Sequence, residues 1–393
     1  MAEPGSTASP IAAPYDLRAL RETEFPWADG TTWLDHASIG PLPERTRRAA
    51  DRMNLRRARP FELTPDDLFG AFAAARSAFA QLIHAEADEI ALTTNTTFGL
   101  SIAARALPWR SGDIVLVSQK EFPANVYPWM RLGNLGVTLE LVPVTPEGWP
   151  DEARLLARLA DPKVRCLAVS LTQFANGYTV DLARLSAETR ARGQFLVVDA
   201  IQALGQMPFD VRAVPVDILS CGAQKWLLSP WGSGFLYVRR ELIAALDPAV
   251  TGWMAFEGTD DLSRLTDYHE ALRPDARRFE LITLPFQDFV GMLQSLALLR
   301  ELGIDAIQRH ILSLQPPLLD WAERRGVRVT SPRGPHGSGI ICLAPPRLDD
   351  SYRALREARI YLSQREGALR ISPHCYNTAD EMVRVTTVLD RLL

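Results

Sequence analysis

The chain has 393 residues, of which 47% are hydrophobic and 23% are charged, a composition typical of a globular protein with a large core. Its formal net charge is −4 at pH 7, and no block of lysines and arginines stands out, so we expect neither nucleic acid nor a membrane surface as a partner. The four cysteines lack paired spacing, which predicts neither a disulfide framework nor a zinc site, and we expect no bound metal. They are Cys166, Cys221, Cys342 and Cys375.

The N-terminal residues 1–14 are rich in alanine, proline and serine, without a charged start or an apolar centre. This pattern predicts a disordered tail and not a signal peptide. No run in the chain approaches the ~18 apolar residues of a membrane span. We therefore expect a soluble, cytoplasmic protein.

The first half of the chain alternates between helical spacing and short apolar runs. We expect a helix over 15–25, a brief strand over 31–34 and exposed arginines on the helical stretch 43–84. A strand over 90–93 then runs into a polar turn and a helix that continues through Ala106. Further strands are predicted at 113–117 and 164–170.

The stretch 195–238 carries the clearest chemical signal. Its first strand, Phe195 to Val198, ends at Asp199, and a second apolar strand, Val216 to Ser220, ends shortly before Lys225. An acid and a lysine at the ends of adjacent buried strands suit a pyridoxal phosphate (PLP) site, because the lysine amine attaches the cofactor and the carboxylate keeps the pyridine nitrogen protonated. The alternative is a surface lysine beside a strand-end aspartate, but a lysine in so apolar a run is seldom without a role.

These residues resemble the class V aminotransferase family. The chain reads V-D-x-x-Q at 198–202 and Q-K-W-L-x-x-P-x-G-x-G-F-L-Y-V at 224–238. The family includes cysteine desulfurases, isopenicillin N epimerase-like proteins, kynureninase relatives and C–S lyases. The resemblance implies that Lys225 forms the Schiff base with PLP, that Asp199 pairs with the ring nitrogen and that Gln202 donates to the ring hydroxyl. It also places Gln224 among the cofactor-binding residues.

The resemblance assigns two further cofactor contacts. Thr96 and Thr97 match the turn that the family places under the phosphate, and free N–H groups at a helix start suit that role, although threonine is also an ordinary helix cap. Phe122 matches the ring that lies flat on the cofactor, worth ~0.5–1.5 kcal/mol beyond its burial. Desulfurases use histidine there, which shuttles protons as Phe122 cannot. Core packing is the alternative role of Phe122.

The residues expected on the substrate side of the site carry a weaker sequence signal. His36 matches a segment at the mouth of the site, although it could equally stabilise a turn with Asp35. Gln173 and Asn176 follow the 164–170 strand and are candidates to face the ring hydroxyl or the substrate, beside a position where desulfurases carry asparagine and this chain has phenylalanine. Trp253 lies in a loop that we expect to border the substrate.

A match to R-F-E-x-G-T at 278–283 implies a contact between subunits. In relatives its threonine, here Thr283, reaches the phosphate of the neighbouring subunit, although Ile282 replaces the usual glycine. The resemblance therefore implies a homodimer with its sites at the subunit interface.

The C-terminal part, from about residue 286, switches to long helices and short strands, which predicts an α+β domain. It ends with the family pattern G-x-[LIV]-R-[IVA]-S followed by Y-N-T. By resemblance Arg370 clamps the α-carboxylate of the substrate, as a planar fork of donors can; a surface ion pair is the alternative. The desulfurase loop with its nucleophilic cysteine is missing between Tyr361 and Arg370, so we do not expect a cysteine desulfurase.

Alternating strands and helices predict βαβ units and an α/β fold. The resemblance implies a fold-type I PLP transferase: a large domain over 15–285, with a mainly parallel seven-stranded sheet between helices, and a small α+β domain over 286–393. Residues 15–30 are expected to pack on the small domain.

The expected function is a PLP enzyme that acts on an α-amino acid through an external aldimine, with Lys225 as general base. An aminotransferase comes first, and a C–S lyase or an epimerase of the isopenicillin N type are the alternatives. Two other functional classes have weaker support in the sequence. A nucleotide-binding oxidoreductase would need G-x-G-x-x-G in the first βα turn, and a catalytically silent relative would not need to keep the lysine, the ring-holding residues and the arginine.

Overall fold

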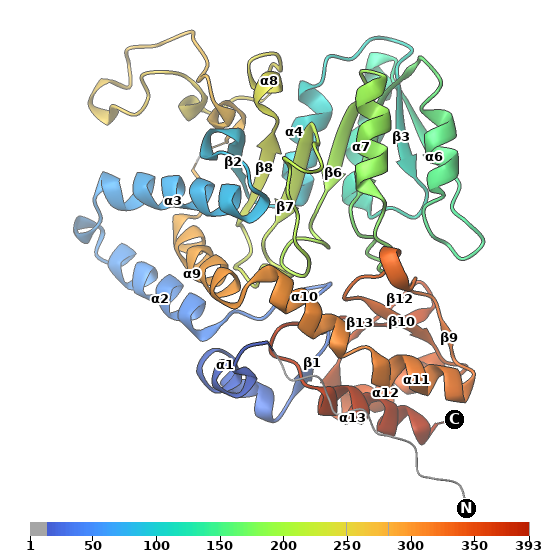
Figure 1. Cartoon of the computed structure of the whole chain (residues 1–393). Coiled ribbons are helices and arrows are strands. Elements are labelled where there is room, and N and C mark those ends of the chain that lie inside the picture. The colour runs from blue at the N-terminus through green and yellow to red at the C-terminus, as the bar shows by residue number, and fades with distance from the viewer. Residues whose placement is uncertain (1–13, 249, 282, 393) are drawn as a thin grey trace, which may run out of the picture.

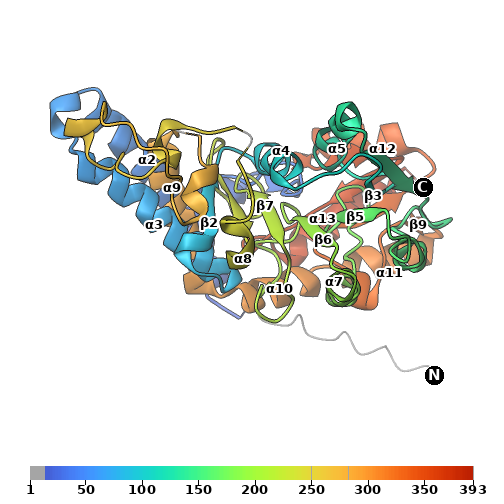
Figure 2. The same cartoon turned by 90° about the horizontal axis from the view of Figure 1, so that it is seen from above.

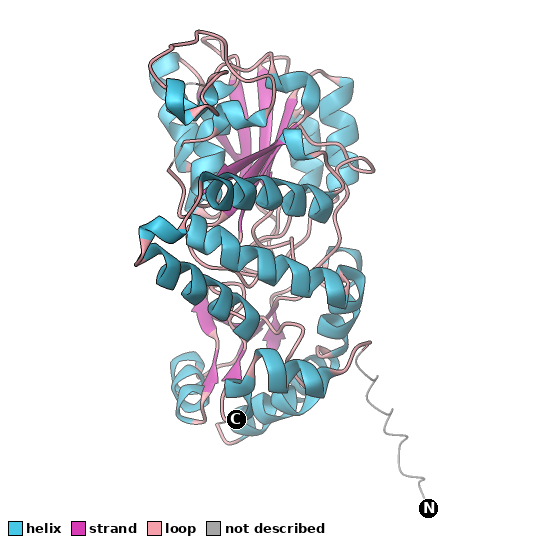
Figure 3. Cartoon of the chain, turned by 90° about the vertical axis from the view of Figure 1, so that its left-hand side faces the viewer, coloured by secondary structure: helices cyan, strands magenta, loops and turns pink. Residues whose placement is uncertain are grey.

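The computed structural model describes residues 14–392 except 249 and 282. Of the predicted tail, only Pro14 lies within the described residues. The chain forms a larger α/β part and a smaller α+β part, stacked one above the other (Figure 1; Figure 3 shows the larger sheet above the smaller). In the described ranges no helix is both long enough and apolar enough to cross a bilayer.

The larger part is built on a seven-stranded sheet with the order β2-β8-β7-β6-β5-β3-β4. All strands are parallel except β8, which runs antiparallel to both of its neighbours. This confirms the predicted mainly parallel sheet. The strands are β2 Ile90–Thr93, β3 Ile114–Ser118, β4 Thr138–Val142, β5 Val164–Ser170, β6 Phe195–Asp199, β7 Ile218–Gly222 and β8 Gly234–Val238.

Helices cover both faces of this sheet, because successive side chains of a buried strand point in opposite directions. Val115 and Val117 of β3 pack with α4 (Thr96–Ala106) and α5 (Tyr127–Met130) on one face. Leu116, between them, faces the core formed with α3 (Pro65–Ile83), α6 (Glu152–Arg158) and α7 (Leu182–Ala191). Figure 2 shows the sheet between these layers.

The smaller part holds an antiparallel four-stranded sheet with the order β12-β13-β10-β9. Its own core, which includes Trp321, Leu369 and Val385, lies between this sheet and the C-terminal helices. The elements are α10 Ile304–Ser313, α11 Pro316–Arg325, β9 Arg328–Val329, β10 Ile341–Ala344, α12 Leu348–Glu357, β12 Ser363–Arg365, β13 Ala368–Ile371 and α13 Ala379–Asp390.

The N-terminal segment lies against this smaller part. The short strand β1 (Thr32–Trp33) pairs in parallel with β11 (Ile360–Tyr361). Arg21, on α1 (Leu17–Glu24), donates from Nη1 to the backbone oxygen of Tyr376 at 2.8 Å. The first residues thus bring Asp35 and His36 beside the end of β13, where Asp35 forms a parallel bridge with Ser372. The predicted domain division at residues 285 and 286 stays a prediction.

Two long helices near the N-terminus pack against α9 (Phe286–Leu302) and link the two parts of the chain. The predicted helical stretch 43–84 is divided into α2 (Glu44–Arg57) and α3. Pro60 interrupts it, and Thr64 starts α3 in a capping box with Asp67, since a proline ring and a reciprocal cap both favour a new helix start.

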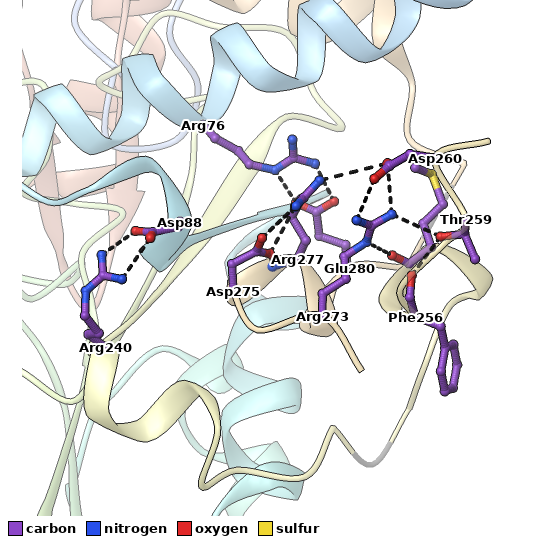
Figure 4. A network of polar contacts seen from close by, with 11 residues as sticks. Arg76, Asp88, Arg240, Phe256, Thr259, Asp260, Arg273, Asp275, Arg277 and Glu280 are labelled. Carbon is purple, nitrogen blue, oxygen red and sulfur yellow. Dashed lines mark hydrogen bonds and ion pairs between the residues drawn. The ribbon is translucent and has the colours of Figure 1, made fainter. Parts of the chain in front are cut away.

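The segment 251–280, which we call the arm, leaves the large sheet after α8 (Arg240–Ile243) and returns to it. Its root is held by ion pairs (Figure 4): within the arm Arg273 donates to both carboxylate oxygens of Asp260, and the buried carboxylate of Glu280 accepts from Arg76 of α3 at 2.7 and 2.8 Å. Glu280 also accepts from the Leu92 N–H of β2 at 2.9 Å. The root of the arm is therefore fixed to the large part by the buried Glu280–Arg76 ion pair, whose charges compensate each other.

Candidate active site

Asp199 and Lys225 lie at the same edge of the large sheet. Asp199 is the last residue of β6, and Lys225 follows the end of the adjacent parallel strand β7 by three residues. Asp199 is 2% exposed, and its Oδ1 accepts from the backbone N–H of Ile201 at 3.0 Å. The parallel pairing of β6 and β7 therefore brings the carboxylate and the amine to one place, as the sequence predicts.

Burial changes the charge preference of both groups, because a low dielectric disfavours ionised forms. It raises the pKa of the Asp199 carboxyl, and the nearby carboxylate of Glu121 raises it further. Burial lowers the pKa of the Lys225 amine to about 8, while the negative charge of Asp199 opposes this shift. Lys225 is therefore far more often neutral, and so more nucleophilic, than an exposed lysine at physiological pH.

The lowered pKa gives a test of the lysine. Because only the neutral amine attacks an aldehyde, the rate at which cofactor-free protein takes up PLP should rise with pH and reach half its maximum near pH 8, the pKa of Lys225. Uptake is followed in a stopped-flow spectrophotometer from about pH 6 to about pH 11, a range that includes the ordinary lysine pKa of ~10.4. A midpoint near that ordinary value would contradict the environment described for Lys225.

Gly40 allows the backbone to approach Lys225 closely. A Cβ at position 40 would lie 2.1 Å from the carbonyl oxygen of Lys225, and the Gly40 N–H donates to the Gln224 oxygen at 2.9 Å. Leu228, just beyond, adopts a left-handed φ of 53°, a conformation that is strained for a branched side chain. The close approach of Gly40 and the left-handed conformation of Leu228 therefore both define the turn that carries Lys225.

Gln202 is buried next to this turn, and two hydrogen bonds fix the orientation of its side-chain amide. The indole N–H of Trp226 donates to Oε1 of Gln202 at 2.9 Å, and Nε2 of Gln202 donates to the Ala37 oxygen at 2.9 Å. An amide nitrogen has two N–H groups, so one remains to donate elsewhere. This is compatible with the predicted bond to a ring hydroxyl.

The start of α4 offers a place for an anion next to β7. Thr96 and Thr97 are its first two residues, whose N–H groups have no carbonyl one turn back within the helix. A Cβ on Gly222 would lie 3.3 Å from both N and Oγ1 of Thr96, so the missing side chain keeps this helix end open. Oγ1 of Thr96 accepts from the Gly222 N–H at 2.8 Å and can still donate its own proton. Thr97 is exposed.

An aromatic pair forms the wall beside the lysine. Phe122, which follows β3, is 42% exposed, and the Nζ of Lys225 lies 5.4 Å from the centre of its ring. Phe174 meets Phe122 edge-on with ring centres 5.2 Å apart. A ring this exposed is not core packing, so its position fits a flat aromatic ligand between Phe122 and the sheet edge.

Arg370 reaches this edge from the smaller part of the chain. It lies on β13 and is 2% exposed, and its Nη1 donates to the Phe174 oxygen at 2.9 Å. Its Nη2 donates to Ser38 Oγ at 2.6 Å and to Asp35 Oδ1 at 3.3 Å, while its buried Nε–H has no hydrogen-bond partner among the described residues. Arg370 is therefore a buried ion pair with an unsatisfied donor, and not the surface pair that was the alternative.

Sequence reasoning missed Glu121, which is buried next to the predicted residue Phe122. Its carboxylate accepts from the N–H of Ser170 at 2.7 Å and from the Ser170 hydroxyl at 2.5 Å. Gln173 Nε2 donates to it at 2.8 Å, so this predicted substrate residue has its nitrogen bonded to Glu121. The sequence signal that could have found Glu121 is an acid three residues after the end of a buried strand.

Two predicted substrate residues have both polar ends bonded within the protein. His36 is fully buried, with Nδ1 2.7 Å from the Ser372 oxygen and Nε2 3.0 Å from the Tyr376 hydroxyl. Burial keeps its pKa well below the ordinary value. Asn176 donates to the Gly148 oxygen and accepts from the Tyr178 N–H, each at 3.0 Å. These contacts favour structural roles, and for His36 they agree with the alternative that it stabilises the local chain.

Trp253 and Thr283 lie on and just beyond the arm. Trp253 is 45% exposed and lines a surface hollow of about 600 Å³ whose lining residues all come from the arm, from Trp253 to His269. Thr283 is exposed. Their expected contacts with substrate and with a second subunit stay predictions, and Ile282, which bears on the second, lies outside the described residues.

The residues at this edge fit PLP. The carboxylate of Asp199, the amine of Lys225, the open start of α4 beside Gly222 and the exposed ring of Phe122 supply one partner each for the ring nitrogen, the aldehyde, the phosphate and the ring face. Among the described residues no group of three or more His, Cys, Asp or Glu side chains is placed to hold a metal ion.

Comparison with known proteins identifies relatives over most of the chain. The model of the family described as aminotransferase class-V matches residues 66–385. An uncharacterized aminotransferase of Bacillus subtilis, YcbU, is 29% identical over 308 residues, which cover 78% of this chain and 80% of the relative. The isopenicillin N epimerase of Amycolatopsis lactamdurans is 29% identical over 391 residues, which cover 92% and 95%.

A solved structure supports the fold. A C-DES mutant with glycine covalently linked to its PLP cofactor superimposes with a TM-score of 0.85 at 22% identity, covering 94% of this chain and 98% of that one. The similarity confirms the predicted fold-type I architecture.

Proposed function

The chain belongs to the class V aminotransferase family of PLP-dependent enzymes, and we propose that it transfers the amino group of an α-amino acid. The observation that supports this most strongly is the pairing of a half-buried Lys225, whose pKa is lowered to about 8, with buried Asp199 on the adjacent strand. When bound, PLP withdraws electrons from the Cα of the substrate and so makes its proton removable.

The residues of the chain divide the remaining work. Asp199 holds a proton on the ring nitrogen through its buried negative charge, which is most effective where water is excluded. Arg370 binds the carboxylate of the substrate, and its buried Nε–H, which has no partner within the described ranges, is a donor left for that role. Lys225, once released, takes the α-proton with its neutral Nζ.

Transamination is favoured because, of the described residues assigned to this site, Lys225 is the one suited to move the proton. Phe122 stands where desulfurases carry a proton-transferring histidine, and its ring has no exchangeable proton. The cysteines of the described residues are all buried, and burial raises the pKa of the Cys221 thiol well above its ordinary value. A single amine on one side of the substrate favours transamination, because the proton is then removed and returned on that same side. Inversion at Cα needs a second proton donor on the opposite side.

A panel of amino acids added to the PLP-loaded protein tests this proposal. Transamination predicts conversion of the ~420 nm absorption to the ~330 nm band of the aminated cofactor, with one keto acid formed per site and reversal by added keto acid. Catalytic release of pyruvate or sulfide would instead identify a lyase. Loss of optical rotation without cofactor conversion would identify an epimerase, and either result would overturn the proposal.

A further inference from the structure

Arg370 is already paired with a carboxylate of the protein itself. Asp35 comes from the N-terminal segment, 335 residues away in sequence, and its Oδ1 lies 3.3 Å from Nη2 of Arg370. The Asp35 side chain is 13% exposed and that of Arg370 2%. A pair this buried is little screened by solvent or salt.

Two serine hydroxyls close a ring around the ion pair. Arg370 Nη2 donates to Ser38 Oγ at 2.6 Å, Ser38 Oγ lies 3.0 Å from Ser363 Oγ, and the Ser363 hydroxyl donates to Asp35 Oδ2 at 2.6 Å. Both carboxylate oxygens of Asp35 are therefore held, and the carboxylate cannot turn away from the arginine without losing a bond. The negative charge at Asp35 is a fixed feature of the site.

We propose that Asp35 is a positioning residue that orients Arg370 and weakens its hold on the substrate carboxylate. This inference rests on the proposed function, in which Arg370 binds that carboxylate. The pair leaves Arg370 with the Nε–H and one Nη1–H unbonded by Asp35, Ser38 or Phe174. Of these, the Nε–H points to the same side of the guanidinium as Nη2, which is bonded to Asp35, so a substrate carboxylate that accepts from the Nε–H comes close to a second negative charge. A site that must release an acidic product after each turnover benefits from such moderated binding.

Replacement of Asp35 by asparagine tests the charge while keeping an oxygen for Arg370, and the amide N–H can donate to the Ser363 hydroxyl. The probes are aminooxyacetate and O-methylhydroxylamine, which both displace the lysine from PLP through the same aminooxy group, although only the first has a carboxylate. The rate constants are read from the loss of the absorption of lysine-bound PLP. Their ratio reports the hold on the carboxylate and cancels any change in cofactor reactivity.

In Asp35→Asn the ratio of the aminooxyacetate rate constant to the O-methylhydroxylamine rate constant should rise on the order of tenfold, as expected for removal of one nearby charge at an intermediate dielectric. Ser363→Ala is the matched control, because it removes a bond to Asp35 but no charge, and it should not raise the ratio. Asp29→Asn, whose side chain is 84% exposed, controls for net charge. An unchanged or smaller ratio in Asp35→Asn would overturn the inference.

Arg370→Ala separates this inference from the proposed function. If the ratio does not fall in Arg370→Ala, Arg370 does not bind the carboxylate. Its role in the proposed function and the inference about Asp35 then both fail. If it falls, but Asp35→Asn leaves the ratio unchanged, only the role of Asp35 is wrong. Asp35→Ser serves as a second neutral variant, and failure of both neutral variants to bind PLP would also contradict the inference, since moderated binding does not require the charge for folding.

Discussion

Lys225→Ala should abolish the ~420 nm absorption of the PLP-loaded protein and slow exchange of the substrate α-proton by at least about 10³-fold, because the covalent attachment and the general base are lost together. The sheet should be unaffected, since Lys225 lies in a turn beyond β7 and contributes no strand pairing. The measurements are the absorption spectrum after dialysis and the rate of deuterium incorporation at Cα by NMR.

Lys163→Ala is the matched control. The chain has three lysines, Lys120, Lys163 and Lys225, and Lys163 is exposed just before β5. This variant should keep the absorption and the exchange rate of the parent. A Lys225→Ala protein that still absorbs near 420 nm after dialysis would show that the cofactor is attached elsewhere.

Asp199→Asn should give the second largest loss. The amide has nearly the same shape as the carboxylate but carries no charge to stabilise a protonated ring nitrogen, so α-proton exchange should slow by about 10²–10³-fold, the usual cost of removing one preorganised electrostatic partner. Lysine-bound PLP should still form, because the amine is untouched. Deuterium exchange and the absorption spectrum measure the two effects separately.

A second buried aspartate, just before the adjacent strand β7, provides the control for Asp199. Asp217 is 6% exposed at the opposite end of β7, where it accepts from the Leu196 N–H and pairs with Arg239. Asp217→Asn should lower the stability of the fold, since it leaves Arg239 without its buried partner, but exchange per folded, PLP-loaded site should stay at the parental value. Equal slowing in both variants would contradict the role assigned to Asp199.

The parts of the site that lie close to one strand end could be predicted from the sequence. Asp199 and Lys225 follow buried apolar runs, and parallel strands bring such ends together whatever the rest of the chain does. The start of α4 was predictable for the same reason, because Thr96 lies three residues after the end of β2. Here local pattern and global fold agree.

The parts that depend on long-range contacts could not be predicted. The motif around Arg370 identifies the arginine, but its bond to Asp35 depends on how the N-terminal segment meets the smaller sheet. His36 shows the same limit, because its motif matched the mouth of a site while its ring is buried against Ser372 and Tyr376. The hydrophobic periodicity of a sequence does not show which of two polar residues will form hydrogen bonds inside the folded protein.

The most direct test of the account is to reduce the PLP-loaded protein with borohydride and map the labelled peptide by mass spectrometry. The chain offers three lysines, of which Lys225 alone lies beside Asp199 at the site. The account predicts one phosphopyridoxyl group per chain, carried by Lys225. A label on Lys120 or Lys163, or no label on a protein that still shows the absorption, would contradict it.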